Sequence, residues 1–148
     1  MMTHSPEQTR AFAEKLASCL SRGDVLLFYG DLGAGKSEFI RGLARGLGIS
    51  GPIASPSFTI MNLYDEGRLP LYHFDWYRLE SSDELYEMGL DEYLGGDGIA
   101  CVEWPTQCPD AIPPVHLAIE LIPLGETDRE IRLTPSAGFH SLPSEVIS

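Results

Sequence analysis

Apolar side chains recur at helical spacing near the start of the chain. Ser5 stands before Pro6, and these residue types favour a helix N-cap and the first helical position. Phe12 and Leu16 follow at an interval of four, which places them on one face of a helix. The pattern therefore predicts a first helix that ends near Gly23.

The apolar pattern changes after this helix. Residues 25–29 (VLLFY) form a short apolar run, which is typical of a strand buried on both faces. A glycine-rich segment follows at once. From Lys36 the apolar positions return to helical spacing, until Gly46 to Gly48. These features predict a strand, a tight turn and a second helix in direct succession.

Two β-prone runs follow in the middle of the chain. Residues 58–64 and 70–74 are separated by the polar stretch 65–68, and this arrangement predicts a hairpin or a tight connection. Residues 82–94 carry partly periodic apolar positions and are expected to form a helix.

The last third of the chain adds further strands. Residues 99–102 form another wholly apolar run, which ends at Glu103. Residues 115–122 and 130–133 resemble a terminal pair of strands. The chain from residue 136 to 148 is expected to be a loose tail.

Composition and charge narrow the possible functions. The chain has 148 residues, of which 22 are acidic and 10 basic, so its formal net charge is −12. A free-standing nucleic-acid binder needs a basic face, and this balance argues against one. The length supports one compact domain.

The sequence has no run of eighteen apolar residues and no basic or apolar leader, so we expect a cytoplasmic protein without a membrane segment.

One motif carries specific chemistry. Residues 30–37 (GDLGAGKS) match GxxxxGK[ST] in full, between the predicted strand and the predicted second helix. Glycines allow the backbone amides to curl around phosphate oxygens, and the helix N-terminus adds its positive dipole. Lys36 would reach the β- and γ-phosphates, and the Ser37 hydroxyl would take one Mg²⁺ position. The sequence therefore predicts a nucleoside-triphosphate site.

Such a site needs an acid at the end of a second buried strand. Glu103 follows four apolar residues, whereas Asp75 follows the more mixed run LYHF. The local pattern favours Glu103. His73, within that mixed run, is interpreted as a hydrogen-bonded strand residue rather than a base.

Several features near these acids leave two interpretations open. Ser55, Ser57 and Thr59 are either phosphate-sensing hydroxyls or plain turn residues. Trp76 and Trp104 directly follow the two acids and would lie either beside the nucleotide or in the core.

Two further features concern the base and the partners. The acidic segment 83–97 is either a solvated face or a docking surface for a basic partner. The only asparagine, Asn62, is not part of an Asn-Lys-x-Asp guanine-selecting element, so adenine is favoured.

The strongest segments also occur together in one known family. They are GDLGAGKSEFIRGLARGLG from residue 30, SPSFTIMNLY from 55, HFDWYRL from 73, MGLDEY from 88 and CVEWP from 101. In this order they resemble the bacterial TsaE (YjeE) ATPases of tRNA threonylcarbamoyladenosine synthesis. The resemblance runs from about Thr9 to Leu133. It implies a single α/β P-loop NTPase domain over residues 1–135, with a mainly parallel central sheet flanked by helices.

The resemblance also implies roles for individual residues. The phosphates would be wrapped by Gly33, Ala34, Gly35, Lys36, Ser37 and Glu38. Ser37 and Glu103 would hold Mg²⁺, and Asp75 would act with Lys36 in ATP hydrolysis near the γ-phosphate. Thr9 and Arg129 would contact the nucleotide from its base or outer side.

The partners implied are a TsaD-type transferase and a TsaB-type companion. Together they would attach a threonylcarbamoyl group to the adenosine 3′ of the anticodon in tRNAs that read A-starting codons. This chain would not perform the transfer and would meet tRNA only indirectly, which agrees with its negative charge.

The chain departs from the family pattern at three points. Ser37-Glu38 replaces the usual Thr-Thr, so Glu38 brings a carboxylate where a hydroxyl is common. Residues 55–57 read Ser-Pro-Ser in place of Ser-Pro-Thr, and Thr106 and Gln107 stand where an acid often follows CVEWP.

Two other functions share the predicted site. A small-molecule P-loop kinase has a similar length, but kinases of this kind carry an arginine-bearing lid, and only Arg129 and Arg132 follow Arg78 here. A nucleotide-gated binding module without required turnover would use the same pocket.

Overall fold

The structure, a computed structural model, describes residues 1–31 and 34–147. Within this part of the chain the strands form one seven-stranded sheet in the order β1-β7-β6-β2-β5-β4-β3. The strands are β1 (Met2–Thr3), β2 (Val25–Tyr29), β3 (Met61–Tyr64), β4 (Leu71–Asp75), β5 (Ile99–Glu103), β6 (Leu117–Pro123) and β7 (Arg129–Pro135). The α-helices are α1 (Pro6–Ala17), α2 (Lys36–Gly46), α3 (Ser82–Glu87) and α4 (Ser144–Ile147). The described residues also form 3₁₀ turns at Leu90–Tyr93, Pro105–Gln107 and Pro109–Ala111.

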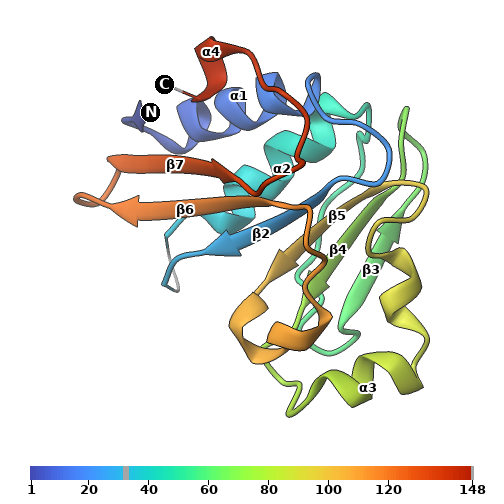
Figure 1. Cartoon of the computed structure of the whole chain (residues 1–148). Helices are drawn as coiled ribbons and strands as arrows, with labels where there is room; N and C mark the ends of the chain where they lie inside the picture. The colour runs from blue at the N-terminus through green and yellow to red at the C-terminus, as the bar shows by residue number, and fades with distance from the viewer. Residues whose placement is uncertain (32–33, 148) are drawn as a thin grey trace.

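The centre of the sheet is parallel and its edges are antiparallel. Strand β2 pairs in parallel with both β5 and β6, and β5 pairs in parallel with β4. The outer pairs β3–β4, β6–β7 and β1–β7 are antiparallel. Figure 1 shows α1 and α2 stacked along one face, with α3 on the other side of the sheet. The expected α/β fold with a mainly parallel central sheet flanked by helices is confirmed.

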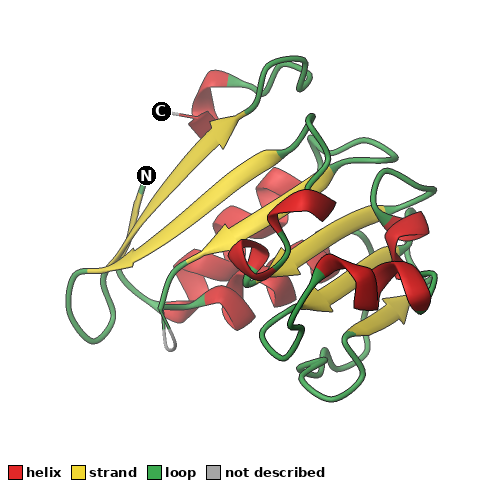
Figure 2. Ribbon diagram, turned by 60° about the horizontal axis from the view of Figure 1, so that its bottom comes forward, coloured by secondary structure: helices red, strands yellow, loops and turns green. Residues whose placement is uncertain are grey.

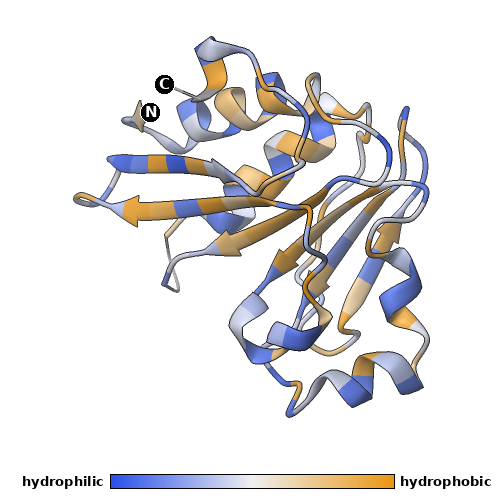
Figure 3. Ribbon diagram, viewed as in Figure 1, coloured by the Kyte–Doolittle hydropathy of each residue, from blue (hydrophilic) through white to orange (hydrophobic). Residues whose placement is uncertain are grey.

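Alternation along the central strands separates two apolar layers. In β2, Leu26 and Phe28 pack beneath α1 and α2, whereas Val25 and Leu27 face the layer that includes α3. A strand turns successive side chains to opposite faces, so a run that is apolar at every position is buried on both. In Figure 3 the central strands are coloured mainly as hydrophobic, whereas α3 is largely hydrophilic.

The backbones of α1 and α2 lie very close together. A Cβ atom at Gly42 would come within 2.3 Å of the Arg10 carbonyl oxygen, and one at Gly46 within 2.6 Å of the Ala17 Cβ atom. Only glycine fits where backbones approach this closely. This contact brings the start of α1 next to the start of α2, where the predicted phosphate site lies.

The first helix begins as predicted but ends earlier. The Ser5 side chain accepts a hydrogen bond from the Gln8 amide at 3.1 Å, and Pro6 is the first helical residue. The helix ends at Ala17 rather than near Gly23. The Leu20 amide donates to the Ala17 carbonyl in a tightened final turn, which buries the Leu20 side chain without further helix.

Two middle segments also differ from the prediction. The strand expected from residue 58 begins only at Met61, because the Ile60 amide donates to the Pro56 carbonyl at 2.8 Å and closes a turn. The expected helix over residues 82–94 is divided at Gly89, which has a φ of 71° and separates α3 from a 3₁₀ turn. The β3–β4 hairpin and the β6–β7 pair are confirmed.

The expectation of a loose tail after residue 135 is wrong. Leu142 and Val146 join the core cluster beneath α1 and α2, and α4 contacts α1. Figure 2 shows α4 as the short helix next to the C-terminus. The His140 Nε2 atom lies 2.7 Å from Asp24 Oδ2 and ties the segment to the turn before β2. The segment is held in place because Leu142 and Val146 bury their apolar side chains in this core.

Candidate nucleotide site

The predicted phosphate motif lies where the parallel strands β2, β4 and β5 end. Gly30 follows β2 with a φ of 151°, and a Cβ atom there would lie 2.9 Å from the Leu121 carbonyl oxygen. Gly35 has a φ of 103° and directly precedes α2. Both conformations favour glycine. They return the chain from the strand into the helix within a few residues.

Lys36 is held across this turn. Its Nζ atom donates to the Gly30 carbonyl at 2.8 Å and lies 4.2 Å from the centre of the Trp104 ring. The side chain is 6% exposed. A cation packed on an aromatic face is stabilised by the ring quadrupole. The ammonium group is therefore placed over the glycine-rich turn.

A cavity of about 370 Å³ opens beside this lysine. Residues from five separate segments line it: Gly35, Lys36, Ser37, Glu38, Ser55, Ser57, Asp75, Glu103, Trp104 and Arg129. In open parallel sheets, ligands bind at the carboxyl ends of the strands. The motif, both candidate acids and two of the three loop hydroxyls thus share one hollow.

The two acids that compete in the sequence are neighbours in the structure. Asp75 and Glu103 stand opposite each other in the β4–β5 register, and their exposed fractions are 8% and 9%. Asp75 Oδ1 accepts a hydrogen bond from the Tyr77 amide at 2.9 Å. Glu103 Oε2 lies 2.7 Å from His73 Nε2. Both carboxylates are held in fixed orientations next to the lysine.

Backbone strain accompanies both acids. Within the described residues, Ile60 and Trp104 are the non-glycine residues with positive φ, at 68° and 59°. The Ile60 carbonyl accepts a hydrogen bond from the Asp75 amide at 2.8 Å, and Trp104 directly follows Glu103. Such conformations are costly and cluster at functional sites. The strain here shapes the rim around the two carboxylates.

The hydroxyl-rich loop reaches the same cavity in part. Ser55 and Ser57 line it, and their Oγ atoms lie 2.8 Å apart. The Thr59 hydroxyl instead donates to Asn62 Oδ1 at 2.8 Å and closes the turn before β3. Thr59 is thus a turn residue.

Glu38 is engaged by two arginines. Its Oε2 atom accepts a short hydrogen bond from Arg10 Nη1 on α1, and its Oε1 atom accepts one from Arg41 Nη1 at 2.6 Å. The carboxylate that replaces a common family hydroxyl is therefore neutralised within the protein. If Glu38 contacts a nucleotide as predicted, its backbone amide and not its side chain would make the contact.

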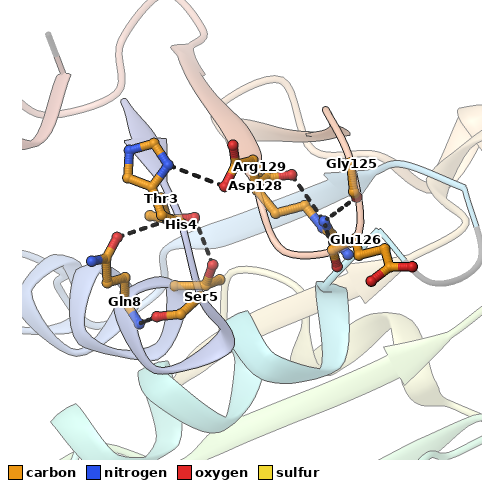
Figure 4. A network of polar contacts seen from close by, with 9 residues as sticks. Thr3, His4, Ser5, Gln8, Gly125, Glu126, Asp128 and Arg129 are labelled. Carbon is orange, nitrogen blue, oxygen red and sulfur yellow. Dashed lines mark hydrogen bonds and ion pairs between the residues drawn. The ribbon is translucent and has the colours of Figure 1, made fainter.

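A second, smaller hollow adjoins the first. It has a volume of about 40 Å³, and Thr9, Gly35, Glu38 and Arg129 are among its lining residues. The Thr9 hydroxyl lies 2.7 Å from the Thr3 hydroxyl. Arg129 donates from Nη1 to the carbonyls of Gly125 and Asp128 at 3.1 and 2.9 Å, so it organises the β6–β7 turn (Figure 4). Thr9 and Arg129 thus line the same hollow beside the turn.

Of the predicted phosphate wrap, Gly33 lies outside the described residues. The Ala34 amide donates to the Asp31 carbonyl at 3.0 Å, so in this structure it serves the turn itself. The open question on the tryptophans is also resolved: Trp76 is fully buried in the core, whereas Trp104 lines the cavity.

Sequence reasoning missed two contacts of the site. It assigned no site role to Arg10, whose partner Glu38 is 28 positions away. It interpreted His73 as a hydrogen-bonded strand residue, which is confirmed, but without identifying Glu103 as its partner. Both contacts join residues on different elements, and no local signal reveals them.

The oxygen donors suit Mg²⁺ in chemical type. Mg²⁺ prefers carboxylate and hydroxyl oxygens, and it usually keeps waters and phosphate oxygens as further ligands. Among the residues the structure describes, no group of three or more His, Cys, Asp or Glu is placed to hold a metal by itself. Ser37 and Glu103 therefore fit a shared site and not a cage made by protein alone.

Fold and site together define an α/β protein whose glycine-rich turn, lysine and paired acids meet at the carboxyl ends of parallel strands. The model of the family "Threonylcarbamoyl adenosine biosynthesis protein TsaE" matches residues 3–131. The chain belongs to this TsaE family. In the part of the chain that is described, no helix is both long and apolar enough to cross a membrane.

Known relatives span nearly the whole chain. It is 43% identical over 146 residues to the tRNA threonylcarbamoyladenosine biosynthesis protein TsaE of Bacillus subtilis. This match covers 99% of this chain and 91% of that protein. The Treponema pallidum protein of the same name is 37% identical over 130 residues, and the match covers 88% of this chain and 96% of that protein. The crystal structure of YdiB from Bacillus subtilis superposes with a TM-score of 0.79 at 40% identity, over 93% of this chain and 84% of that one.

Proposed function

We propose that this protein binds ATP with Mg²⁺ in the cavity beside Lys36 and hydrolyses it. It would do so as an accessory subunit in the threonylcarbamoyl modification of the adenosine 3′ of the anticodon in tRNAs that read A-starting codons. The observation that carries the proposal is the convergence of Lys36, Asp75 and Glu103 on one cavity at the end of the glycine-rich turn.

Lys36 supplies the positive charge of the site. Its Nζ atom donates to the Gly30 carbonyl and lies over the Trp104 ring. A short movement of this ammonium group would bring it onto the β- and γ-phosphates. A lysine that is already ordered loses little side-chain entropy when the nucleotide binds. The start of α2 adds its dipole at the same place.

Ser37 and Glu103 would hold Mg²⁺. The ion, when bound, would neutralise charge on the phosphate oxygens during hydrolysis. Ser37 offers its hydroxyl from the start of α2, and Glu103 offers a carboxylate from the end of β5. Strand β5 lies in the sheet and α2 packs on it through Phe39 and Ile40, so both donors stand on ordered elements.

Asp75 would position the water that attacks the γ-phosphate. Its Oδ1 atom is held by the Tyr77 amide, which leaves the other oxygen free of that contact. A carboxylate oriented in this way can accept a hydrogen bond from water and align it. In the register it faces Glu103, so the water-positioning acid and the metal-binding acid would act side by side.

Thr9 and Arg129 would contact the nucleotide on the outer side of the turn. They line the small hollow next to Gly35 and Glu38. We propose adenine as the base, because the chain has no Asn-Lys-x-Asp element for guanine.

The partners proposed are a TsaD-type transferase and a TsaB-type companion, in the cytoplasm. With a net charge of −12 this subunit would leave tRNA binding to those proteins. Nucleotide hydrolysis would then regulate docking, product release or resetting of the complex.

The test is Mg²⁺-dependent ATP turnover by the purified chain, first alone and then with the transferase pair and tRNA. We expect slow turnover alone and strong stimulation by the partners.

Lys36→Ala should abolish tight triphosphate binding in calorimetry. Lys15→Ala, at the only other lysine, should bind normally. Tight ATP binding by Lys36→Ala, or turnover that the partners leave unchanged, would contradict the proposal. Phosphate transfer to an added metabolite would indicate a kinase.

A further inference from the structure

We propose that His73 is a positioning residue that orients the Glu103 carboxylate for Mg²⁺. This inference rests on the proposed function. His73 does not line the cavity, so it would act only through Glu103.

The first step is the geometry of the pair. In the β4–β5 register His73 stands opposite Cys101, two residues before Glu103. Residues two apart on a strand point to the same face, so His73, Cys101 and Glu103 lie on the α2 side of the sheet. The histidine Nε2 atom lies 2.7 Å from Glu103 Oε2, which is a short hydrogen bond between two parallel strands.

The second step concerns the other ring nitrogen. His73 is 3% exposed, and its Nδ1 atom is buried without a hydrogen-bond partner among residues 1–31 and 34–147. A hydrogen on Nδ1 would be a buried unsatisfied donor, which is costly. The ring therefore carries its hydrogen on Nε2 and donates it to Glu103. Within the described residues the ring thus makes one directed polar contact, to Glu103.

The third step is the effect on the carboxylate. A glutamate has three rotatable side-chain bonds, and a metal site needs one of its many orientations. Because Oε2 receives the His73 hydrogen, Oε1 is the oxygen without a partner among the described residues. The bond thus fixes the plane of the carboxylate and leaves one oxygen for the cavity. Partners of this kind commonly change metal affinity by about 10- to 100-fold when they are removed.

The test measures how much Mg²⁺ strengthens nucleotide binding. Calorimetry with ADP, with and without Mg²⁺, compares the wild type with His73→Leu, His73→Gln and Glu103→Gln. We expect His73→Leu to lower the Mg²⁺ enhancement about tenfold or more while binding without Mg²⁺ is unchanged. His73→Gln can still donate from its amide and should retain most of the enhancement.

A double variant separates positioning from a general structural effect. Glu103→Gln alone should lose the enhancement, and adding His73→Leu should lower it no further. If His73→Leu does not fold, His73→Asn replaces it, because its shorter amide cannot reach Glu103. An unchanged Mg²⁺ enhancement in the loss variant, or an equal loss of binding without Mg²⁺, would overturn the inference.

A wild type that binds ADP without any response to Mg²⁺ would overturn the proposed function, and the role of His73 with it. A second measurement is independent of any metal. Nitrogen-15 spectra of the histidine rings should show His73 protonated at Nε2 and not at Nδ1. A hydrogen on Nδ1 alone would contradict the assignment.

Discussion

Arg129 donates from Nε to the carbonyl oxygen of Ala34 at 2.9 Å and joins the last hairpin to the glycine-rich turn. The two residues are 95 positions apart in the chain. The same guanidinium binds carbonyls of the turn between β6 and β7. One side chain therefore ties the outer wall of the proposed nucleotide site to the turn that would hold the phosphates.

This contact predicts that charge alone cannot replace Arg129. A lysine keeps the positive charge but lacks the planar fork that serves several carbonyls at once. We expect Arg129→Lys to weaken nucleotide binding about tenfold, because one or two hydrogen bonds at the turn are lost. Arg132→Lys on the same strand, where Arg132 pairs with Glu120 and Glu130, is the control. Equal affinities for the two variants in calorimetry would contradict the prediction.

Replacing Asp75 should separate binding from hydrolysis. Asparagine keeps the oxygen that accepts the Tyr77 amide but removes the charge. We expect Asp75→Asn to bind ATP normally and to hydrolyse it roughly 100-fold or more slowly. Asp65→Asn in the exposed β3–β4 connection is the control. If Asp75→Asn lost hydrolysis but still supported tRNA modification with the partners, the protein would be a nucleotide-gated module.

The packed C-terminal segment predicts a measurable loss of stability. Leu142 is 8% exposed and belongs to the core cluster. We expect Leu142→Ala to lower the free energy of unfolding by about 2 kcal/mol, because it leaves a cavity beside α1. Leu124→Ala, whose side chain is 52% exposed, should change it by less than about 0.5 kcal/mol. Urea titration measures both, and equal midpoints would mean that the tail is loose after all.

Cys101 predicts a loss of stability at alkaline pH. Burial raises the pKa of its thiol above the ordinary value of 9.0, and the negative charge of Glu103 acts in the same direction. The unfolded chain therefore loses this proton from about pH 9 upward while the folded chain keeps it, so stability is full below pH 9 and falls above it.

The size of this effect follows from the unfolded state. Between pH 8 and pH 10 the wild type should lose about 1.4 kcal/mol more unfolding free energy than Cys101→Ala. Urea titrations under reducing conditions at the two pH values measure the difference. Burial also raises the pKa values of Tyr72 and Cys108, so some alkaline loss should persist in the variant. Parallel losses in both proteins would contradict the prediction.

Local patterns were sufficient for much of the fold. The apolar run 25–29, the glycine-rich turn and the helix from Lys36 were all predicted from residues adjacent in the chain. Buried strands and helix starts depend on neighbours within a few positions, which a sequence displays directly. Where a turn residue intervened, as at Gly89, the same patterns extended an element too far.

The sequence by itself determined which residue types carry the chemistry: the GxxxxGK[ST] motif with Lys36, and two acids at strand ends. Only the tertiary structure decided their relations. It set Asp75 and Glu103 side by side, gave Glu103 its partner His73, joined Arg129 to Ala34, and buried Leu142 beneath α1. The physical reason is that such contacts join residues far apart in the chain. Their distances depend on the order of strands in the sheet and on how closely α1 and α2 pack, and no local pattern of residues encodes either.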